Sequence, residues 1–357
     1  GSKPVIVKAP GLVAPDFTWE TVTQMDFGFD ASFLNNRLTG TFDWYRRNTK
    51  DMLVAGATLP ATLGASVPKS NSADMKTIGW ELSLGWNDRL ENGFSYWVKG
   101  VLSDYQATIT KYAGNDAGFY SQSDGDGKYY VGQKIGEIWG YHSNGLFQSD
   151  DEAATIDQSE LYAGKWGAGD VKYEDLDNDG KITKGEETIY NPGDKSIIGN
   201  KTPRYQFGIT VGFDYKNFDF EMFWQGTGKR DYMLSGAQFW GFTSQWDVPY
   251  TPALDYWTET NTDAYFPRPG WQNGGNRVTS DRYLQSAAYG RLKNLTVGYT
   301  IPKNLTTKWG ISRLRLYVTG ENLLTITPLN DAFDPETLGG MTYPINRKVA
   351  IGLNLTL

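Results

Sequence analysis

The sequence predicts an all-β fold in which about nine antiparallel strands form part of a transmembrane β-barrel. Three observations support this prediction. Polar and apolar residues alternate along many segments of the chain. These segments are long enough to cross a bilayer as tilted strands. The connections between them are short and long in turn, which is typical of outer-membrane barrels.

The alternation is clearest in YQFGITVGFDY (205–215), where every second residue is apolar or aromatic. The same period of two occurs in 25–33, 38–44, 80–86 and 349–357. This period is that of a strand with one apolar and one polar face. We expect the polar face to line a lumen and to carry Asp26, Asp30, Asp43, Glu81, Asp214, Asp219 and Glu221.

About nine segments show this pattern, and each exceeds the roughly 9–11 residues that a tilted strand needs to cross a membrane. They are 19–33, 36–53, 74–88, 92–112, 204–216, 218–232, 283–301, 312–326 and 343–357. The short connections between them are 34–36, 88–93, 215–217 and 302–312. The long connections are 54–73, 113–203, 233–282 and 327–342. Short turns face the periplasm and long loops face outward in such barrels.

An odd strand count leaves two open edges, and unpaired backbone groups in hydrocarbon cost several kcal/mol each. Bacterial single-chain barrels have an even number of strands. We therefore expect this chain to be one part of a larger barrel. A strand hidden in 113–203 would change the count, so parity alone does not decide the question.

Composition excludes several classes of function. The chain of 357 residues has no cysteine and a single histidine, His142, so neither thiolate chemistry nor a multi-histidine metal site is expected. The net charge of −7 argues against a nucleic-acid partner. No run of about 18 apolar residues predicts a transmembrane helix. No pair of carboxylates stands out as catalytic, and we do not expect an enzyme.

The segment YEDLDNDGKITKGEE (173–187) has the spacing of a calcium-binding loop. Counted from Asp175, carboxylates fall at positions 1, 3, 5 and 12, glycine at position 6, and a backbone carbonyl ligand at position 7. The predicted metal ligands are Asp175, Asp177, Asp179, Lys181 and Glu186. The flanks do not read as helices, so we expect a structural Ca²⁺ loop outside an EF-hand. The alternative is a solvated acidic turn, as we expect for 123–128.

Several segments resemble the SusC/RagA-like TonB-dependent transporters of Bacteroidetes outer membranes. The resemblance rests on GDVKYEDLDNDGKIT, DYWTETNTDAYFP, YGRLKNLTVGYTIP, LRLYVTGENLL, FDPE and YPINRKVAIGLNLTL, which occur in the family's order. It covers nearly the whole chain and corresponds to the C-terminal portion of the family's barrel. The chain departs from the family at Leu357, where members usually end in an aromatic residue.

The resemblance implies a barrel of about 22 strands that encloses an N-terminal plug. It also implies TonB-dependent import of an oligosaccharide or peptide through the outer membrane of a Bacteroidetes-type Gram-negative bacterium. The implied partners are a SusD-like lipoprotein lid, the remaining barrel and plug portion, TonB acting through the plug, and outer-membrane lipid. The alternative, from the residues alone, is a calcium-stabilised extracellular carbohydrate-binding or adhesion β-protein.

The loop 233–282 is rich in aromatic residues, which stack on sugar rings and anchor protein interfaces. We expect contacts to substrate or to a partner at Trp240, Trp246, Trp257 and Trp271, unless these rings pack the loop on itself. The chain thus divides into strands with an N-terminal extracellular segment (1–112), a long loop with the calcium-like segment 175–186 (113–203), a hairpin (204–232), the aromatic-rich loop (233–282) and C-terminal strands (283–357).

Overall fold

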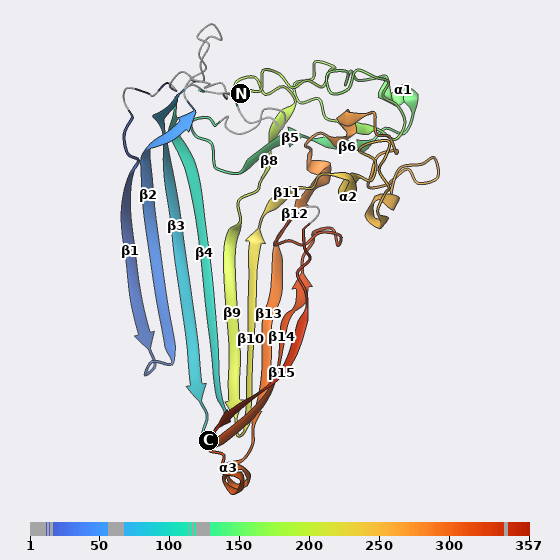
Figure 1. The fold of residues 1–357 in the computed structure, drawn as a ribbon. Helices are drawn as coiled ribbons and strands as arrows, with labels where there is room; N and C mark the ends of the chain where they lie inside the picture. The colour runs from blue at the N-terminus through green and yellow to red at the C-terminus, as the bar shows by residue number, and fades with distance from the viewer. Residues whose placement is uncertain are drawn as a thin grey trace, which may run out of the picture.

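One large antiparallel sheet dominates the computed structural model, which describes residues 12, 14, 17–55, 68–113, 115, 118, 129–338 and 342–357 (Figure 1). Its strand order is β1-β2-β3-β4-β9-β10-β13-β14-β15. The strands are β1 (Thr21–Phe33), β2 (Leu38–Ala55), β3 (Lys69–Arg89), β4 (Ser95–Tyr112), β9 (Arg204–Tyr215), β10 (Phe218–Lys229), β13 (Tyr289–Thr300), β14 (Arg313–Ile326) and β15 (Lys348–Thr356). The nine strands confirm the predicted all-β fold, and each contains most of one predicted segment.

The register brings the predicted apolar positions of all strands onto one face of the sheet. One row of directly paired residues crosses all nine strands and is apolar except for a single glycine. This row is Phe33, Leu38, Trp86, Val98, Val211, Met222, Leu295, Gly320 and Val349. The sheet therefore has one apolar and one polar face, because successive side chains of a strand point to opposite sides.

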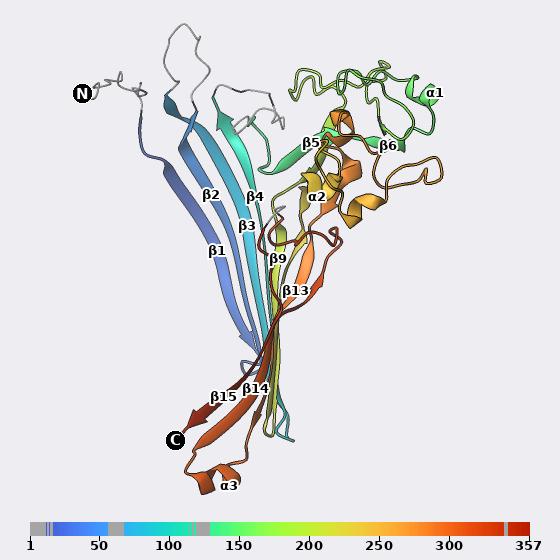
Figure 2. The same ribbon diagram turned by 45° about the vertical axis from the view of Figure 1, so that its right-hand side comes forward.

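The sheet is open at both ends in the described part of the chain. β1 pairs only with β2, and β15 pairs only with β14. The view in Figure 2 shows that the sheet is curved, with β1 and β15 on the same side of β9. No helix among the described residues is long and apolar enough to span a membrane.

Three of the four long connections, those that follow β4, β10 and β14, pack into a single body at one end of the sheet, which we call the loop unit (129–203, 231–287 and 327–338; Figure 1). It contains the paired strands β5 (Glu137–Tyr141) with β8 (Lys195–Asn200), β6 (Ser143–Leu146) with β7 (Val171–Tyr173), and β11 (Asp231–Met233) with β12 (Leu284–Ser286). Its helices are α1 (Asp150–Ala153), α2 (Ala237–Trp240), η2 (Thr251–Leu254), η3 (Gly274–Arg277) and η4 (Asp281–Tyr283). None of these strands joins the large sheet.

The loop unit has its own hydrophobic core, to which all three long connections contribute. Its buried side chains include Tyr173 and Ile182 from the first connection, Phe239 and Tyr283 from the second, and Phe333 from the third. The opposite end of the sheet carries short turns and one longer turn with α3 (Lys303–Thr306) and η5 (Thr307–Trp309), near the C-terminus (Figure 1).

Three strands begin five or six residues away from the predicted start: β3 at Lys69 and not 74, β15 at Lys348 and not 343, and β13 at Tyr289 and not 283. The segment 283–301 was expected to be one strand, but β13 begins only at Tyr289. The preceding residues pair with β11 in the loop unit, where Tyr283 and Ala287 are buried in the core. Burial of these side chains pulls the chain away from the sheet, which the local alternation does not reveal.

Candidate functional site

The calcium-like loop folds around its first aspartate. The carboxylate of Asp175 accepts hydrogen bonds from the backbone N–H groups of Asn178 (2.7 Å), Asp179 (3.3 Å) and Gly180 (2.8 Å). Gly180 has a φ of +84°, a conformation that favours glycine, so the turn residue stands where the sequence pattern requires it. The carboxylate of Asp177 accepts from the N–H of Asp179 (3.1 Å).

Three carboxylates converge at this loop. One oxygen each from Asp175, Asp177 and Asp194 lie within 4.8 Å of one another. Two residues of the predicted ligand set, Asp179 and Glu186, do not belong to this group, and both are exposed. The structure thus brings together two predicted ligands and one residue that the sequence pattern did not select.

Asp194 is fully buried, and backbone N–H groups hold its carboxylate in place. It accepts from Leu176 at 2.8 Å and from Thr183 at 2.7 Å. The neighbouring Ile182 is also fully buried and belongs to the core of the loop unit. Ile182, the eighth residue of the loop counted from Asp175, therefore fixes one side of the loop to the core.

The local environment shifts the pKa values of Asp175 and Asp177 in opposite directions. Desolvation and the carboxylates of Asp179, Asp194 and Asp175 raise the pKa of Asp177 above its ordinary value, although the N–H of Asp179 opposes this. Desolvation also disfavours the charge of Asp175, but the donated backbone hydrogen bonds prevail and lower its pKa. The second acidic stretch, 123–128, lies outside the described residues.

The four predicted contact tryptophans have different surroundings. Trp240 is only 8% exposed and lies 4.6 Å, between ring centroids, from Tyr283 in the core. Trp257 packs against the same core, and its indole nitrogen is buried. These two rings stabilise the loop unit and offer little surface to a ligand. Trp246 and Trp271 are 83% and 45% exposed.

The exposed tryptophans lie on segments that a single arginine ties together. The guanidinium of Arg277 donates to the carbonyl oxygens of Phe242 (3.4 Å), Gly270 (3.1 Å) and Trp271 (2.9 Å). Burial lowers the pKa of Arg277, although the nearby carboxylate of Asp247 opposes this. Around Trp246, further apolar side chains are also exposed, and they are Val248, Tyr250 and Leu254. We call these residues, with Trp246 and Trp271, the aromatic patch.

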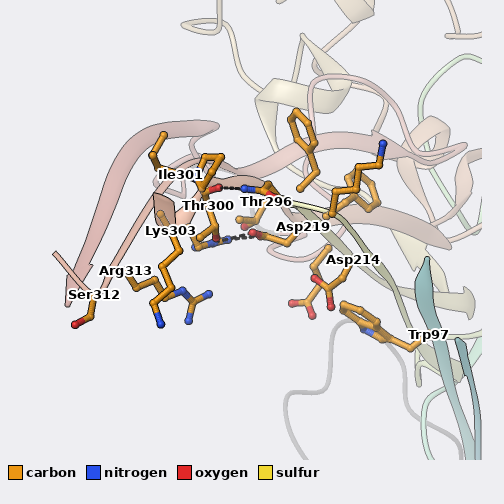
Figure 3. A pocket seen from close by; sticks show the side chains of 16 residues that line it. Trp97, Asp214, Asp219, Thr296, Thr300, Ile301, Lys303, Ser312 and Arg313 are labelled. Carbon is orange, nitrogen blue, oxygen red and sulfur yellow. Dashed lines mark hydrogen bonds and ion pairs between the residues drawn. The ribbon is translucent and has the colours of Figure 1, made fainter. Parts of the chain in front are cut away.

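A cavity of about 820 Å³ lies on the sheet at the end that carries α3, opposite the loop unit (Figure 1), and Figure 3 shows the residues that line it. Its walls include polar-face residues of β4, β9, β10, β13 and β14 together with the β13–β14 turn. Within it, Asp219 and Arg315 form a two-bond ion pair, and the amide of Asn217 donates to the carbonyl oxygen of Thr300 at 2.6 Å. Sequence reasoning placed Asp214, Asp219 and Glu221 on this face but did not foresee the cavity.

The family model described as "TonB dependent receptor-like, beta-barrel" matches residues 7–323. The chain belongs to this family. It corresponds to the C-terminal portion of the barrel in SusC/RagA-like members. These are outer-membrane proteins of Gram-negative bacteria and not enzymes, so the apolar face of the sheet meets lipid. A water-soluble β-protein would not expose such a face.

Similar proteins include TonB-dependent receptor P3 of Formosa agariphila, 30% identical over 97% of this chain and 35% of that protein. TonB-dependent receptor SusC of Bacteroides thetaiotaomicron is 26% identical over 97% of this chain and 33% of its own length. The solved RagAB peptide transporter has a TM-score of 0.72 at 22% identity, over 96% of this chain and 36% of that chain. This chain thus spans about a third of the length of these relatives.

Proposed function

We propose that this chain supplies wall and external loops to a TonB-dependent importer of a nutrient, either an oligosaccharide or a peptide. The observation that carries the proposal is a membrane-facing sheet whose edge strands, β1 and β15, have no outer partner among the described residues, with a packed loop unit at one end. The relatives support it, since one is named the receptor SusC and a similar solved structure is described as a peptide transporter.

The direction of the edge strands constrains what completes the wall. Nine antiparallel strands are an odd number, so β1 and β15 run the same way, from the loop unit toward α3. An antiparallel closure therefore needs an odd number of further strands, the outer two running the opposite way. A second copy of this sheet in the same orientation cannot close the barrel by antiparallel pairing, because its edge strands run parallel to β1 and β15. The complement is an N-terminal barrel and plug portion, from the same gene product or another chain.

The aromatic patch supports docking of a SusD-like lipoprotein over the loop unit. Large rigid rings on a packed body lose little conformational entropy on binding and often dominate interface affinity. Arg277 donates to the carbonyl oxygens of Gly270 and Trp271, and Asp247 accepts from the N–H groups of Thr243 and Ser244 in the turn that carries the exposed Trp246. In this arrangement the lid and the loop unit enclose the nutrient, and TonB, acting on the plug, drives its release inward.

A structural Ca²⁺ completes the proposal. Hard oxygen ligands at this spacing suit Ca²⁺, and the converging carboxylates of Asp175, Asp177 and Asp194 fit such an ion. Asp179, Glu186 and the carbonyl of Lys181 remain candidates for the other positions. Bound Ca²⁺ would neutralise the carboxylates and hold the loop against Ile182 and the core. We expect no catalytic role.

The function is tested by uptake in cells that carry the complete receptor and its lipoprotein. One panel of fluorescent oligosaccharides and one panel of fluorescent peptides are added separately to cells with TonB and to cells without it. We expect one panel to enter, and TonB deletion to abolish entry. Uptake that persists without TonB, or after the proton gradient is collapsed, would contradict energy-coupled import.

A further inference from the structure

The outward, lipid-facing side of β2 and β3 changes from apolar to basic toward the loop unit. Trp44 of β2 and Trp80 of β3 are paired in the register and lie on the apolar face. Beyond this aromatic pair, the outward positions of β2 are polar or charged, and Asn48 stands directly opposite Lys76 of β3. The cations on this face, which we call the basic rim, are Arg46, Lys50 and Lys76.

The basic rim lies where the apolar part of the outward face ends. On the neighbouring β1 this face is apolar from Phe33 to Met25, which stands opposite Arg46. These eight steps span about 26 Å along the strand, comparable to the apolar band of outer-membrane barrels. The rim is at the end of the sheet that carries the loop unit (Figure 1), and long loops of such barrels face outward. It therefore lies at the level of the lipid headgroups of the outer leaflet.

The three cations of the basic rim form no ion pair with another described residue. The guanidinium of Arg46 donates only to the amide oxygen of Asn48, at 3.3 Å. Two carboxylates of the neighbouring strand positions are bound elsewhere: Asp104, opposite Trp80, pairs with Arg204, and Asp74 accepts from the N–H of Asp51 at 2.9 Å. The rim thus retains positive charge, although the chain as a whole has a net charge of −7.

The positive charge is confined to β2 and β3. The rows that contain Arg46 and Lys76 continue on β4 with the uncharged Gln106 and Thr108. Within the rim, Arg46 and Lys50 are about 13 Å apart along β2, and the position of Lys76 falls between them. Long, flexible side chains at these positions can converge on a single headgroup, so the rim has the dimensions of a site for one lipid.

We propose that the basic rim binds a phosphorylated lipid of the outer leaflet. Its phosphate groups meet Arg46, Lys50 and Lys76, since guanidinium and ammonium groups form strong charge-assisted hydrogen bonds with phosphate oxygens. Its acyl chains lie along the apolar face next to Trp44 and Trp80. These apolar positions favour a lipid over a soluble anion, which would leave them without a partner. The site requires the membrane location of the sheet and is independent of nutrient import.

Native mass spectrometry of the complete receptor in detergent measures the binding of added lipid. The probe is lipid A with two phosphate groups, and the comparison probe is the same lipid A after removal of its phosphates. The double variant Arg46→Gln with Lys76→Gln should weaken binding of one phosphorylated lipid A about 30-fold, the loss expected for two cations near a membrane surface. Binding of the dephosphorylated lipid should be weak in the wild type and unchanged in the variant.

Arg47→Gln with Lys99→Gln is the matched control. It removes the same two kinds of charge, but from the polar face of β2 and β4, so we expect it to bind phosphorylated lipid A as the wild type does. A second variant, Arg46→Lys with Lys76→Arg, keeps both charges and should retain the binding. This variant separates the loss of charge from a change in packing, and heat-modifiable migration on gels checks that each variant folds.

Three outcomes would overturn the lipid site. The first is equal affinity of the wild type and the Arg46→Gln with Lys76→Gln variant for phosphorylated lipid A. The second is equal affinity of the wild type for the phosphorylated and dephosphorylated lipids, which would mean that the acyl chains alone determine binding. The third is displacement of the lipid by inorganic phosphate at millimolar concentration, which would identify a site for a soluble anion instead.

Discussion

Asp170 and Arg268 are 98 residues apart in the sequence, yet their side chains form two hydrogen bonds of 2.9 and 2.6 Å. Asp170 is 1% exposed and also accepts from the amide of Asn276 at 2.8 Å and the N–H of Gly167 at 2.9 Å. This group joins the connection that follows β4 to the connection that follows β10. The loop unit is therefore held by a buried polar network as well as by its core.

Removal of the arginine should loosen the loop unit. In Arg268→Ala the carboxylate of Asp170 stays buried without its charge partner, and we expect a loss of about 2 kcal/mol of stability. Limited proteolysis and hydrogen exchange of the loop unit measure this loss. Lys165→Ala, which breaks the exposed ion pair of Lys165 with Asp150, should reduce stability much less, because solvent screens an exposed pair. Equal losses in the two variants would refute a special role for the buried pair.

Bound Ca²⁺ should slow hydrogen exchange in the segment 173–194. An ion that binds only the folded state adds about 2.7 kcal/mol to the free energy of unfolding when its concentration is one hundred times its dissociation constant. A chelator should therefore increase hydrogen exchange in this segment, and Asp194→Asn should remove the difference. Asp151→Asn, an exposed residue outside the cluster, serves as the control. Equal exchange in the wild type with and without chelator would contradict a bound structural ion.

The aromatic patch should determine affinity for the lipoprotein. Trp246→Ala and Trp271→Ala should each weaken binding about 10- to 100-fold, the usual range for an interface anchor. Trp309→Ala provides a matched control, because Trp309 is 62% exposed but lies in the turn at the opposite end of the sheet. Binding of purified lipoprotein to immobilised receptor measures the effect. Unchanged affinity in both patch variants would exclude the patch as the docking site.

Adjacent residues of β9 should differ sharply in their tolerance of charge. Val211 lies on the apolar face and Thr210 on the polar face. Val211→Arg places a cation toward lipid and should destabilise the barrel by about 2–4 kcal/mol, while Thr210→Arg should cost far less. Heat-modifiable migration on gels reports the folded fraction. The reverse order of effects would mean that the faces are assigned the wrong way round.

Acid should disorder the turn that presents Trp246. The hydroxyl of Thr243 and the N–H groups of Thr243 and Ser244 donate to Asp247 and hold its pKa below the usual value. A depressed pKa stabilises the turn above the unfolded value of about 4, and this contribution disappears as pH falls through the folded value. Amide exchange at Thr243 and Ser244 should thus rise below about pH 4 relative to Asp247→Asn at the same pH. Identical profiles would contradict this coupling.

The strands were predictable because their signal is local. A period of two needs only neighbouring residues, and the pairing of Val211 with Met222 and Val98 places the apolar positions of three strands on one face, as expected. The boundary at Tyr289 was not predictable in this way. It depends on burial of Tyr283 and Ala287 in a core that three distant connections build together.

The candidate site was predictable only in part, for the same reason. The spacing from Asp175 to Gly180 identified the loop, but Asp194 follows a Pro-Gly turn outside the motif and joins the cluster through the fold. Trp240 and Trp246 look alike in the sequence, and only packing separates a core residue from an exposed one. Gly212 opposite Trp97 was a usable signal, since a glycine on a lumen face leaves room for a ring.

Native mass spectrometry of the detergent-purified complex that contains this chain tests the central claim most directly. We expect a particle that retains a plug-bearing polypeptide and a lipoprotein, with a chelator-sensitive mass of one Ca²⁺. A detergent-free monomer of this chain alone, stable in water, would contradict the assignment of the nine-strand sheet to the wall of a membrane importer.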